Sequence, residues 1–224
     1  MTLKHLILAT ILISTWLASA HAVMPGTVWK KTKVRNKVTV YRGDVPNSKI
    51  VAFRGIGIID ASMAKVLTVI NDQKRIKEWM SDLKETRIVK QISETHRIEY
   101  NLTSTPWPLK NRDFVYYVKW WVSADKKTFK IKMGPATDPS APVTKGVVRG
   151  DLKESEYILK SIENGTKTEI MVEINADPKG AVPKWIVNIF QSIWPSNTIA
   201  GIRDIATEDG YQTDPTYAKF FATK

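Results

Sequence analysis

The spacing of the apolar residues constrains the fold of this chain more than any other feature, because it changes from strand-like to helix-like towards the C-terminus. Apolar and polar residues alternate over 97–103, 128–133 and 169–174. Such alternation is typical of an antiparallel sheet that buries one face. After Pro183 the apolar residues recur three and four positions apart, which predicts a long helix. We therefore expect an α+β domain whose sheet packs against this C-terminal helix.

The N-terminal half adds a hairpin and two short helices to this plan. Residues 38–44 and 50–60 have the composition of two strands joined by a turn. Ser62 can cap a first helix, and apolar spacing over 76–83 predicts a second. Residues 23–37 are basic and show no clear period. The expected order is a hairpin, two helices, about six strands and the long helix.

The first 22 residues are predicted to be a signal peptide. Lys4 and His5 precede an apolar run of about 12 residues, which is shorter than the roughly 20 residues that a membrane span needs. Small residues at Ala20 and Ala22 offer cleavage sites. We expect the protein to be exported, periplasmic or secreted, after cleavage near one of these alanines.

The rest of the chain shows no repeat and no composition shift that would mark a domain boundary. Its length suits one domain with a sizeable core. We expect residues 23–210 to form this single domain and residues 211–224 to form a C-terminal tail.

Composition narrows the chemistry that this chain can perform. It contains no cysteine and 3 histidines, two of which lie in the predicted signal peptide. Thiol nucleophiles, disulfides and thiolate metal sites are therefore excluded, and a histidine relay has few residues to draw on. The carboxylates form no paired motif. We expect no catalytic residues, no metal site and no cofactor.

The net charge of +12 favours anionic partners. Lysine and arginine are scattered along the chain, and only residues 29–37 form a dense basic run. This distribution favours transient contact with an anionic membrane surface over binding of nucleic acid. We expect a monomer.

Five local segments carry more specific information. The first is Pro106 to Tyr117, PWPLKNRDFVYY, and the second is Asp177 to Asn188, DPKGAVPKWIVN. The others are FRGIG at 53–57, Trp79, and the Val-Arg pair at 148–149. In this order they resemble the START family, the steroidogenic-acute-regulatory-protein-related lipid-transfer domains. The resemblance extends over roughly residues 29–207.

The resemblance implies a helix-grip fold, in which a curved antiparallel sheet wraps around the long C-terminal helix and encloses a lipid tunnel. It also implies a ligand cavity and a gate that contacts the membrane. The cavity residues would be Glu99, Tyr100, Phe114, Tyr116, Val118, Ile131, Met133, Val148, Ile170, Val172, Ile186, Ile189, Phe190 and Ile193, and the gate residues Arg112, Lys184, Trp185, Trp194 and Pro195.

The orientation of Glu99 is open at the sequence level. In sterol-carrying proteins that this chain resembles, an acid at this position faces the cavity and pairs with an arginine, but here the arginine position holds Val118. Alternation gives the opposite orientation, because Glu99 points away from Tyr100 and its apolar neighbours. If those neighbours face inward, Glu99 is solvated.

Arg112 and Pro195 each allow two interpretations as well. Arg112 and Asp113 could form a local ion pair that fixes the turn, or Arg112 could close the cavity mouth or meet a lipid head group. Pro195 should kink or break the long helix, since it lacks an amide donor. Together with Gly180 it could let the helix move and open the tunnel, or the helix could be an ordinary core helix.

The leading functional hypothesis is a protein that binds one lipid and carries it between membranes, docking through its basic surface. Sterol, phospholipid and fatty acid all remain candidates for the ligand. Two alternatives stay open. One is an enzyme acting on a bound apolar substrate, since related helix-grip folds include cyclases and hydrolases. The other is a module that senses a lipid and signals to a partner.

Overall fold

The computed structural model describes residues 24–48, 50–80, 82–180 and 182–222. For residues 184–186 and 188–191 it describes the backbone only. Within these ranges, no helix is both long and apolar enough to cross a membrane.

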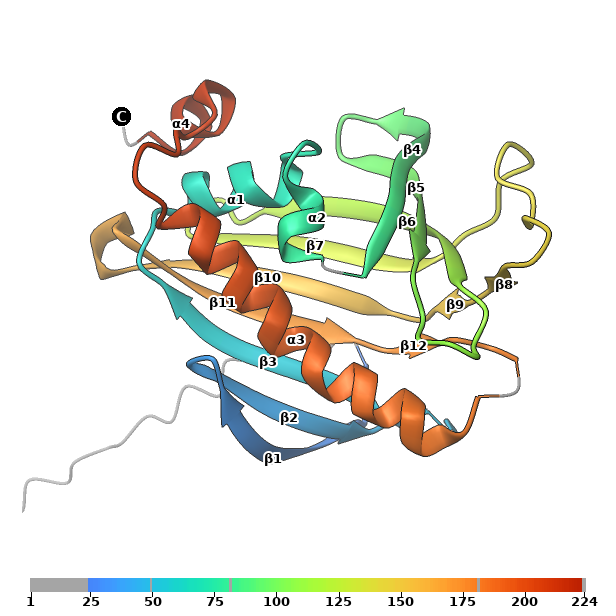
Figure 1. Ribbon diagram of the computed structural model, residues 1–224. Helices are drawn as coiled ribbons and strands as arrows, with labels where there is room; N and C mark the ends of the chain where they lie inside the picture. The colour runs from blue at the N-terminus through green and yellow to red at the C-terminus, as the bar shows by residue number, and fades with distance from the viewer. Residues whose placement is uncertain (1–23, 49, 81, 181, 223–224) are drawn as a thin grey trace, which may run out of the picture.

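Ten strands of the described chain form one curved, mainly antiparallel sheet in the order β1-β2-β3-β11-β10-β7-β6-β5-β4, with β8 parallel to β6 (Figure 1). A separate pair joins β9 to β12. The sheet strands are β1 Val28–Arg35, β2 Val38–Asp44, β3 Ala52–Ile59, β4 Leu83–Ser93, β5 His96–Thr103, β6 Arg112–Val122, β7 Thr128–Pro135, β8 Val148–Arg149, β10 Ser155–Ile162 and β11 Lys167–Ile174, and the pair is β9 Asp151–Leu152 with β12 Ala176–Asp177.

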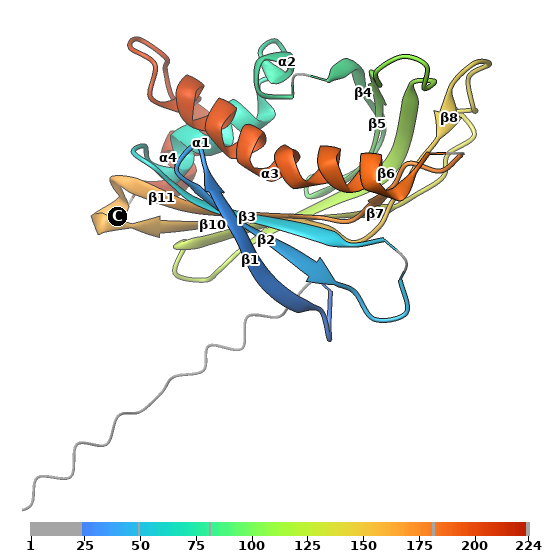
Figure 2. The ribbon, with the colours of Figure 1, turned by 60° about the horizontal axis from the view of Figure 1, so that its bottom comes forward.

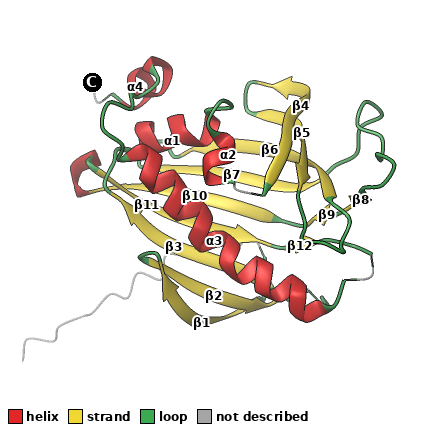
Figure 3. Cartoon of the chain, viewed as in Figure 1, coloured by secondary structure: helices red, strands yellow, loops and turns green. Residues whose placement is uncertain are grey.

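The α-helices gather on the concave face of this sheet (Figure 2). Ser62 caps the first helix, accepting a hydrogen bond from the Lys65 amide at 3.3 Å. The longest helix lies diagonally across the strands, as Figure 3 also shows. The helices are α1 Met63–Asn71, α2 Ile76–Trp79, η1 Glu163–Gly165, α3 Lys184–Ala206 and α4 Pro215–Phe221.

Glycines on β3 let α3 approach the sheet closely. A Cβ atom at Gly55 would lie 2.8 Å from the Pro195 Cβ, and one at Gly57 would lie 3.0 Å from Ile199 Cγ2. The first contact is too short for a side chain, and the second would require Ile199 to shift. Ile199 and Ile202 of α3 are fully buried in this core. The close packing fixes the C-terminal half of α3 on β2, β3 and β11.

The predicted α+β helix-grip fold is therefore confirmed, with three differences in detail. The basic segment before residue 38 forms β1, which adds an edge strand. Of the kink or break predicted at Pro195, the break is wrong, since α3 runs as one helix through this residue. The segment that was expected to be a tail contains α4, whose Tyr217 and Phe221 pack against the core.

Candidate functional site

Two adjoining chambers lie between the concave face of the sheet and the helices. The outer chamber has a volume of about 430 Å³ and the inner chamber about 290 Å³. Volumes of this order are typical of small-molecule sites. Residues from five different regions line both chambers and so mark where they meet: Trp79, Met80, Thr103, Phe114, Ile174, Ala176 and Trp194.

The wall of the inner chamber is mostly apolar and aromatic. Alternate residues of β5, β6, β7 and β10 point into it, because the period of a strand is two. Trp120 stacks on Phe129 with ring centroids 5.2 Å apart. The main wall residues are Tyr116, Val118, Trp120, Phe129, Ile131, Met133 and Tyr157.

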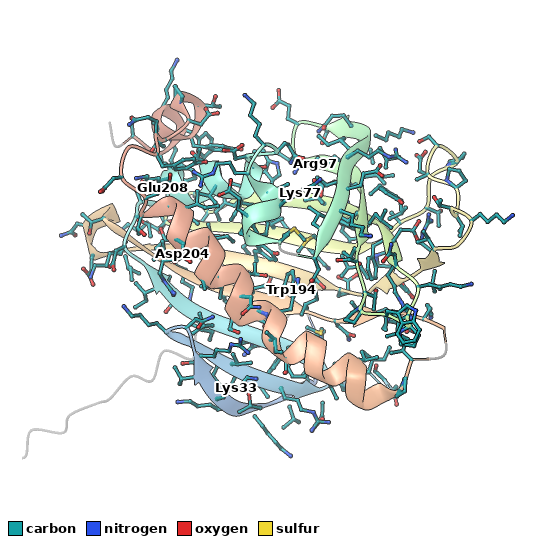
Figure 4. The ribbon with its side chains drawn as sticks, viewed as in Figure 1. Lys33, Lys77, Arg97, Trp194, Asp204 and Glu208 are labelled. Atoms are coloured by element: carbon teal, nitrogen blue, oxygen red, sulfur yellow. The ribbon has the colours of Figure 1, made fainter. Side chains whose placement is uncertain are left out.

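A small polar cluster interrupts this apolar wall. The Arg97 Nε lies 2.5 Å from Glu99 Oε1, and the Tyr116 hydroxyl donates to Glu99 Oε2 at 3.0 Å. Burial raises the pKa of Tyr116 well above its ordinary value, and the charge of Glu99 adds to this effect. Glu99 therefore faces the chamber, and its cationic partner is Arg97 on the same strand. Figure 4 labels Arg97 on β5 and Trp194 on α3, two elements that contribute to the inner chamber.

The sequence already contained the signal for this pair. Arg97 and Glu99 are two residues apart on one strand, so their side chains share a face. By the same rule Tyr100 points to the opposite face, where it packs with Val115 and Ala141 and lies under the Arg87 guanidinium at 4.7 Å. The assignment of Tyr100 to the cavity is therefore wrong.

Three further residues assigned to the cavity lie outside its lining. Ile170 and Val172 of β11 are fully buried in the core, because α3 covers this part of the sheet. Val148 pairs with Arg112 across the short β8 strand, near Gly180. Of the remaining assignments, Glu99, Phe114, Tyr116, Val118, Ile131, Met133 and Ile193 line one or both chambers, while the side chains of Ile186, Ile189 and Phe190 lie outside the described residues.

The residues assigned to the gate lie in different surroundings in the structure. Trp194 lines both chambers and Arg112 lines the outer one. Pro195 is buried and faces Gly55 of β3, because the helix turns it towards the sheet. The side chains of Lys184 and Trp185 lie outside the described residues.

Arg112 and Asp113 do not pair with each other. Asp113 is fully buried and forms two hydrogen bonds with Arg149, at 2.8 Å and 3.0 Å. This bidentate geometry is strong and specific. The local ion pair considered for Arg112 and Asp113 is therefore wrong, because strand alternation sends the two side chains to opposite faces. Arg112 instead donates to three backbone carbonyls, those of Lys110, Pro178 and Lys179.

The structure adds two polar groups to the cavity that the sequence analysis did not assign to it. Trp79 Nε1 and Asn101 Oδ1 are buried, lack a hydrogen-bond partner within the described chain, and belong to residues that line the chambers. The sequence could have predicted that Asn101 lines the cavity, because Asn101 is two residues from Glu99 on β5 and their side chains point to the same face. The position of Trp79 could not be predicted in this way, since its orientation depends on the packing of α2 against α3.

The outer chamber reaches the loop between β5 and β6. Thr105, Pro106 and Leu109 of this loop line the chamber, together with Pro178 from the segment that precedes α3. Trp107 stands at the tip of the loop with 92% of its side chain exposed. A tryptophan this exposed is unusual in a globular domain.

Fold and site together define the class of this protein, a helix-grip domain with an internal apolar cavity. The model of the START domain matches residues 21–193, and the chain belongs to this family.

The chain is also similar to several known proteins. Uncharacterized protein PA1579 of Pseudomonas aeruginosa is 30% identical over 179 residues, which cover 80% of this chain and 86% of that protein. Mouse phosphatidylcholine transfer protein is 24% identical and matches 74% of this chain and 77% of its own length. The crystal structure of human STARD10 superposes with a TM-score of 0.73 at 22% identity, covering 86% of this chain and 76% of that one.

Proposed function

We propose that this protein binds a lipid in the two chambers and carries it between membranes without converting it. The observation that carries the proposal is the pair of adjoining apolar chambers enclosed by the sheet and α3. Such a space removes an acyl chain or ring system from water at a gain of about 25 cal/mol per Å² of apolar surface. The similarity to phosphatidylcholine transfer protein supports the same function.

Membrane docking would use the end of the molecule where the outer chamber lies. Trp107 is exposed there, and Lys110 of the same loop is also exposed. Tryptophan suits the membrane interface because its ring is apolar and its nitrogen is polar. The net charge of +12 would raise the encounter rate with anionic bilayers. We further propose that the protein works as an exported monomer.

The N-terminal half of α3 would move to open the cavity. From Pro195 onwards this helix is held by close contacts with β3 and by the buried Ile199 and Ile202. Trp194 stands at the junction of the two chambers, one residue before this anchored half. Movement before Pro195 would therefore open the chambers without separating α3 from the sheet.

The direct test is to identify what the purified protein carries. Native mass spectrometry before and after organic extraction should show a stoichiometric lipid, and labelled lipid should move from donor to acceptor vesicles when the protein is added. Tight binding without transfer would favour a lipid sensor. A change in the mass of the bound lipid during incubation would favour an enzyme. Absence of any lipid, both as purified and after incubation with vesicles, would contradict the proposal.

A further inference from the structure

Arg112 is a buried cation that lines the outer chamber and has no acidic partner among the described residues. Its exposed fraction is 5%. Its hydrogen bonds go to the carbonyls of Pro178 at 3.3 Å and Lys179 at 3.4 Å, and to that of Lys110. A buried charge normally has a counter-charge, because transfer of an ion out of water costs several kcal/mol.

The acids around this position are already paired or exposed. Asp113, the sequence neighbour of Arg112, is held by Arg149 at 2.8 Å. Asp177 is 2.8 Å from Lys179 Nζ. Asp82 is exposed and forms no ion pair with Arg112, although it also lines the outer chamber. Within the part of the chain that the structure describes, the guanidinium charge is therefore left uncompensated.

The Arg112 guanidinium can accept a further ligand. It carries five N–H donors, and the three carbonyls use three of them. The bonds to Pro178 and Lys179 are also long for hydrogen bonds. Burial lowers the pKa of Arg112, so the surroundings disfavour its charge, and a bound anion would remove this penalty.

The inner chamber offers no unpaired cation among the described residues, since the charged residues that line it are Glu94, Arg97, Glu99 and Glu173. The two charged side chains of its polar cluster, Arg97 and Glu99, neutralise each other at 2.5 Å. An anionic head group would therefore gain from the outer chamber, and a hydrocarbon chain from the apolar walls of the inner one. This difference sets the direction in which a lipid would enter.

We infer that Arg112 forms an oxyanion site for the phosphate group of a phospholipid, whose head lies in the outer chamber and whose chain extends into the inner one. The outer chamber also presents polar side chains that suit the remaining oxygens of a phosphate and its glycerol, namely Ser104, Thr105, Asn197 and Thr198. A carboxylate has only two oxygens and would leave them unused. This inference rests on the proposed function and makes it more specific.

The test compares three ligands with the same chain: lysophosphatidic acid, oleic acid and monooleoylglycerol, titrated by calorimetry into delipidated protein. We expect lysophosphatidic acid to bind at least about tenfold more tightly than monooleoylglycerol, a difference of about 1.4 kcal/mol that one charge-assisted contact can supply. Equal affinities would overturn the site while leaving lipid binding intact. Tighter binding of oleic acid would overturn the phosphate assignment. Failure of all three to bind would count against the proposed function instead.

Variants then test whether Arg112 is responsible for the preference for lysophosphatidic acid. Arg112→Met should reduce the preference for lysophosphatidic acid over monooleoylglycerol to about twofold, and Arg112→Lys should keep part of it. Lys145→Met removes an exposed cation that lines neither chamber and should leave the preference unchanged. Because Arg112 also holds three carbonyls, monooleoylglycerol affinity and a thermal melt report whether each variant is folded. A folded Arg112→Met variant that retains the full preference, or a Lys145→Met variant that loses it, would place the site elsewhere.

A separate competition experiment distinguishes a site for a phospholipid from a site for free phosphate. Inorganic phosphate at millimolar concentration should compete only weakly with lysophosphatidic acid, because it lacks the chain that fills the inner chamber. Binding of inorganic phosphate as tight as that of the lipid would contradict a lipid-specific site.

Discussion

Glu156 is the side chain on the convex face of the sheet whose environment most departs from the ordinary. Its exposed fraction is 3%, and it lies directly opposite Glu173 on the neighbouring strand. Glu173 is compensated by Arg54 at 2.6 Å, and the Arg54 guanidinium stacks on the Trp29 ring at 4.0 Å. Glu156 has no ion pair in the described chain, and burial raises its pKa to about 7.

The raised pKa of Glu156 predicts that the stability of the folded protein falls as pH rises. Below its ordinary pKa of 4.5, Glu156 is protonated in both the folded and the unfolded state. Between 4.5 and about 7 the folded state holds more protons than the unfolded state, so the free energy of unfolding decreases with pH. Glu156→Gln should remove the part of this slope that comes from Glu156 and stabilise the protein at pH 8 by up to about 3 kcal/mol.

Urea unfolding of both proteins at pH 5 and pH 8 measures the effect. Glu169→Gln serves as the control, since Glu169 is on the adjacent strand but pairs with Lys160 at the surface. It should change the unfolding free energy by less than about 1 kcal/mol at either pH. A Glu156→Gln variant whose difference from the unmodified protein is the same at both pH values would contradict the assigned pKa.

At the residue scale the sequence predicted part of the cavity, and its failures have physical causes. Parity along β6 was sufficient for Tyr116 and Val118, because alternation is a local property, but on β5 it left the orientation of Glu99 open, since alternation alone does not say which face of the strand is the inner one. It could not exclude Ile170, which has the correct parity but lies under α3 rather than beside a chamber. The path of α3 across the sheet depends on contacts between distant segments, such as Gly55 with Pro195.

At the scale of elements, α3 connects the core to the cavity. Its C-terminal half packs on β3, and the same half touches α2 through Gly201. A Cβ atom at Gly201 would lie 2.8 Å from both the Cα and the Cβ of Trp79. Trp79 lines both chambers. The spacing between α2 and α3 therefore controls the shape of the cavity.

Gly201→Val should disturb this spacing. The new side chain would push Trp79 away from α3, with a cost of about 2 kcal/mol from overpacking. Lipid binding should weaken along with the melting temperature, because Trp79 moves with α2. Asp204→Val places the same residue type at an exposed position of α3 and should change neither by much. Equal melting temperatures and equal lipid affinities for the two variants would show that a larger side chain at position 201 does not displace Trp79.

For the whole molecule, the sequence predicted the order of the elements better than their extent. The change of period after Pro183 predicted α3, and the alternating segments predicted β5, β7 and β11. The edge strand β1 was missed, because its side chains are almost all exposed and carry no alternation. The helix α4 was missed for a related reason, since its packing against α1 comes from the tertiary fold rather than from its own length of 7 residues.

The asymmetry of the whole molecule leads to a last prediction, that it approaches a membrane with one end. Trp107 stands beside the outer chamber with 92% exposure, whereas Trp121 is 43% exposed at a strand position whose side chain points away from the chambers. Trp107→Ala should weaken binding to phosphatidylglycerol vesicles about five- to tenfold, through loss of interfacial burial, and Trp121→Ala should not. Raising the salt from about 0.05 to 0.5 M should weaken binding of both variants, because screening removes the attraction of the basic surface. Vesicle co-sedimentation measures each effect, and comparable losses for the two tryptophan variants would argue against docking through the chamber mouth.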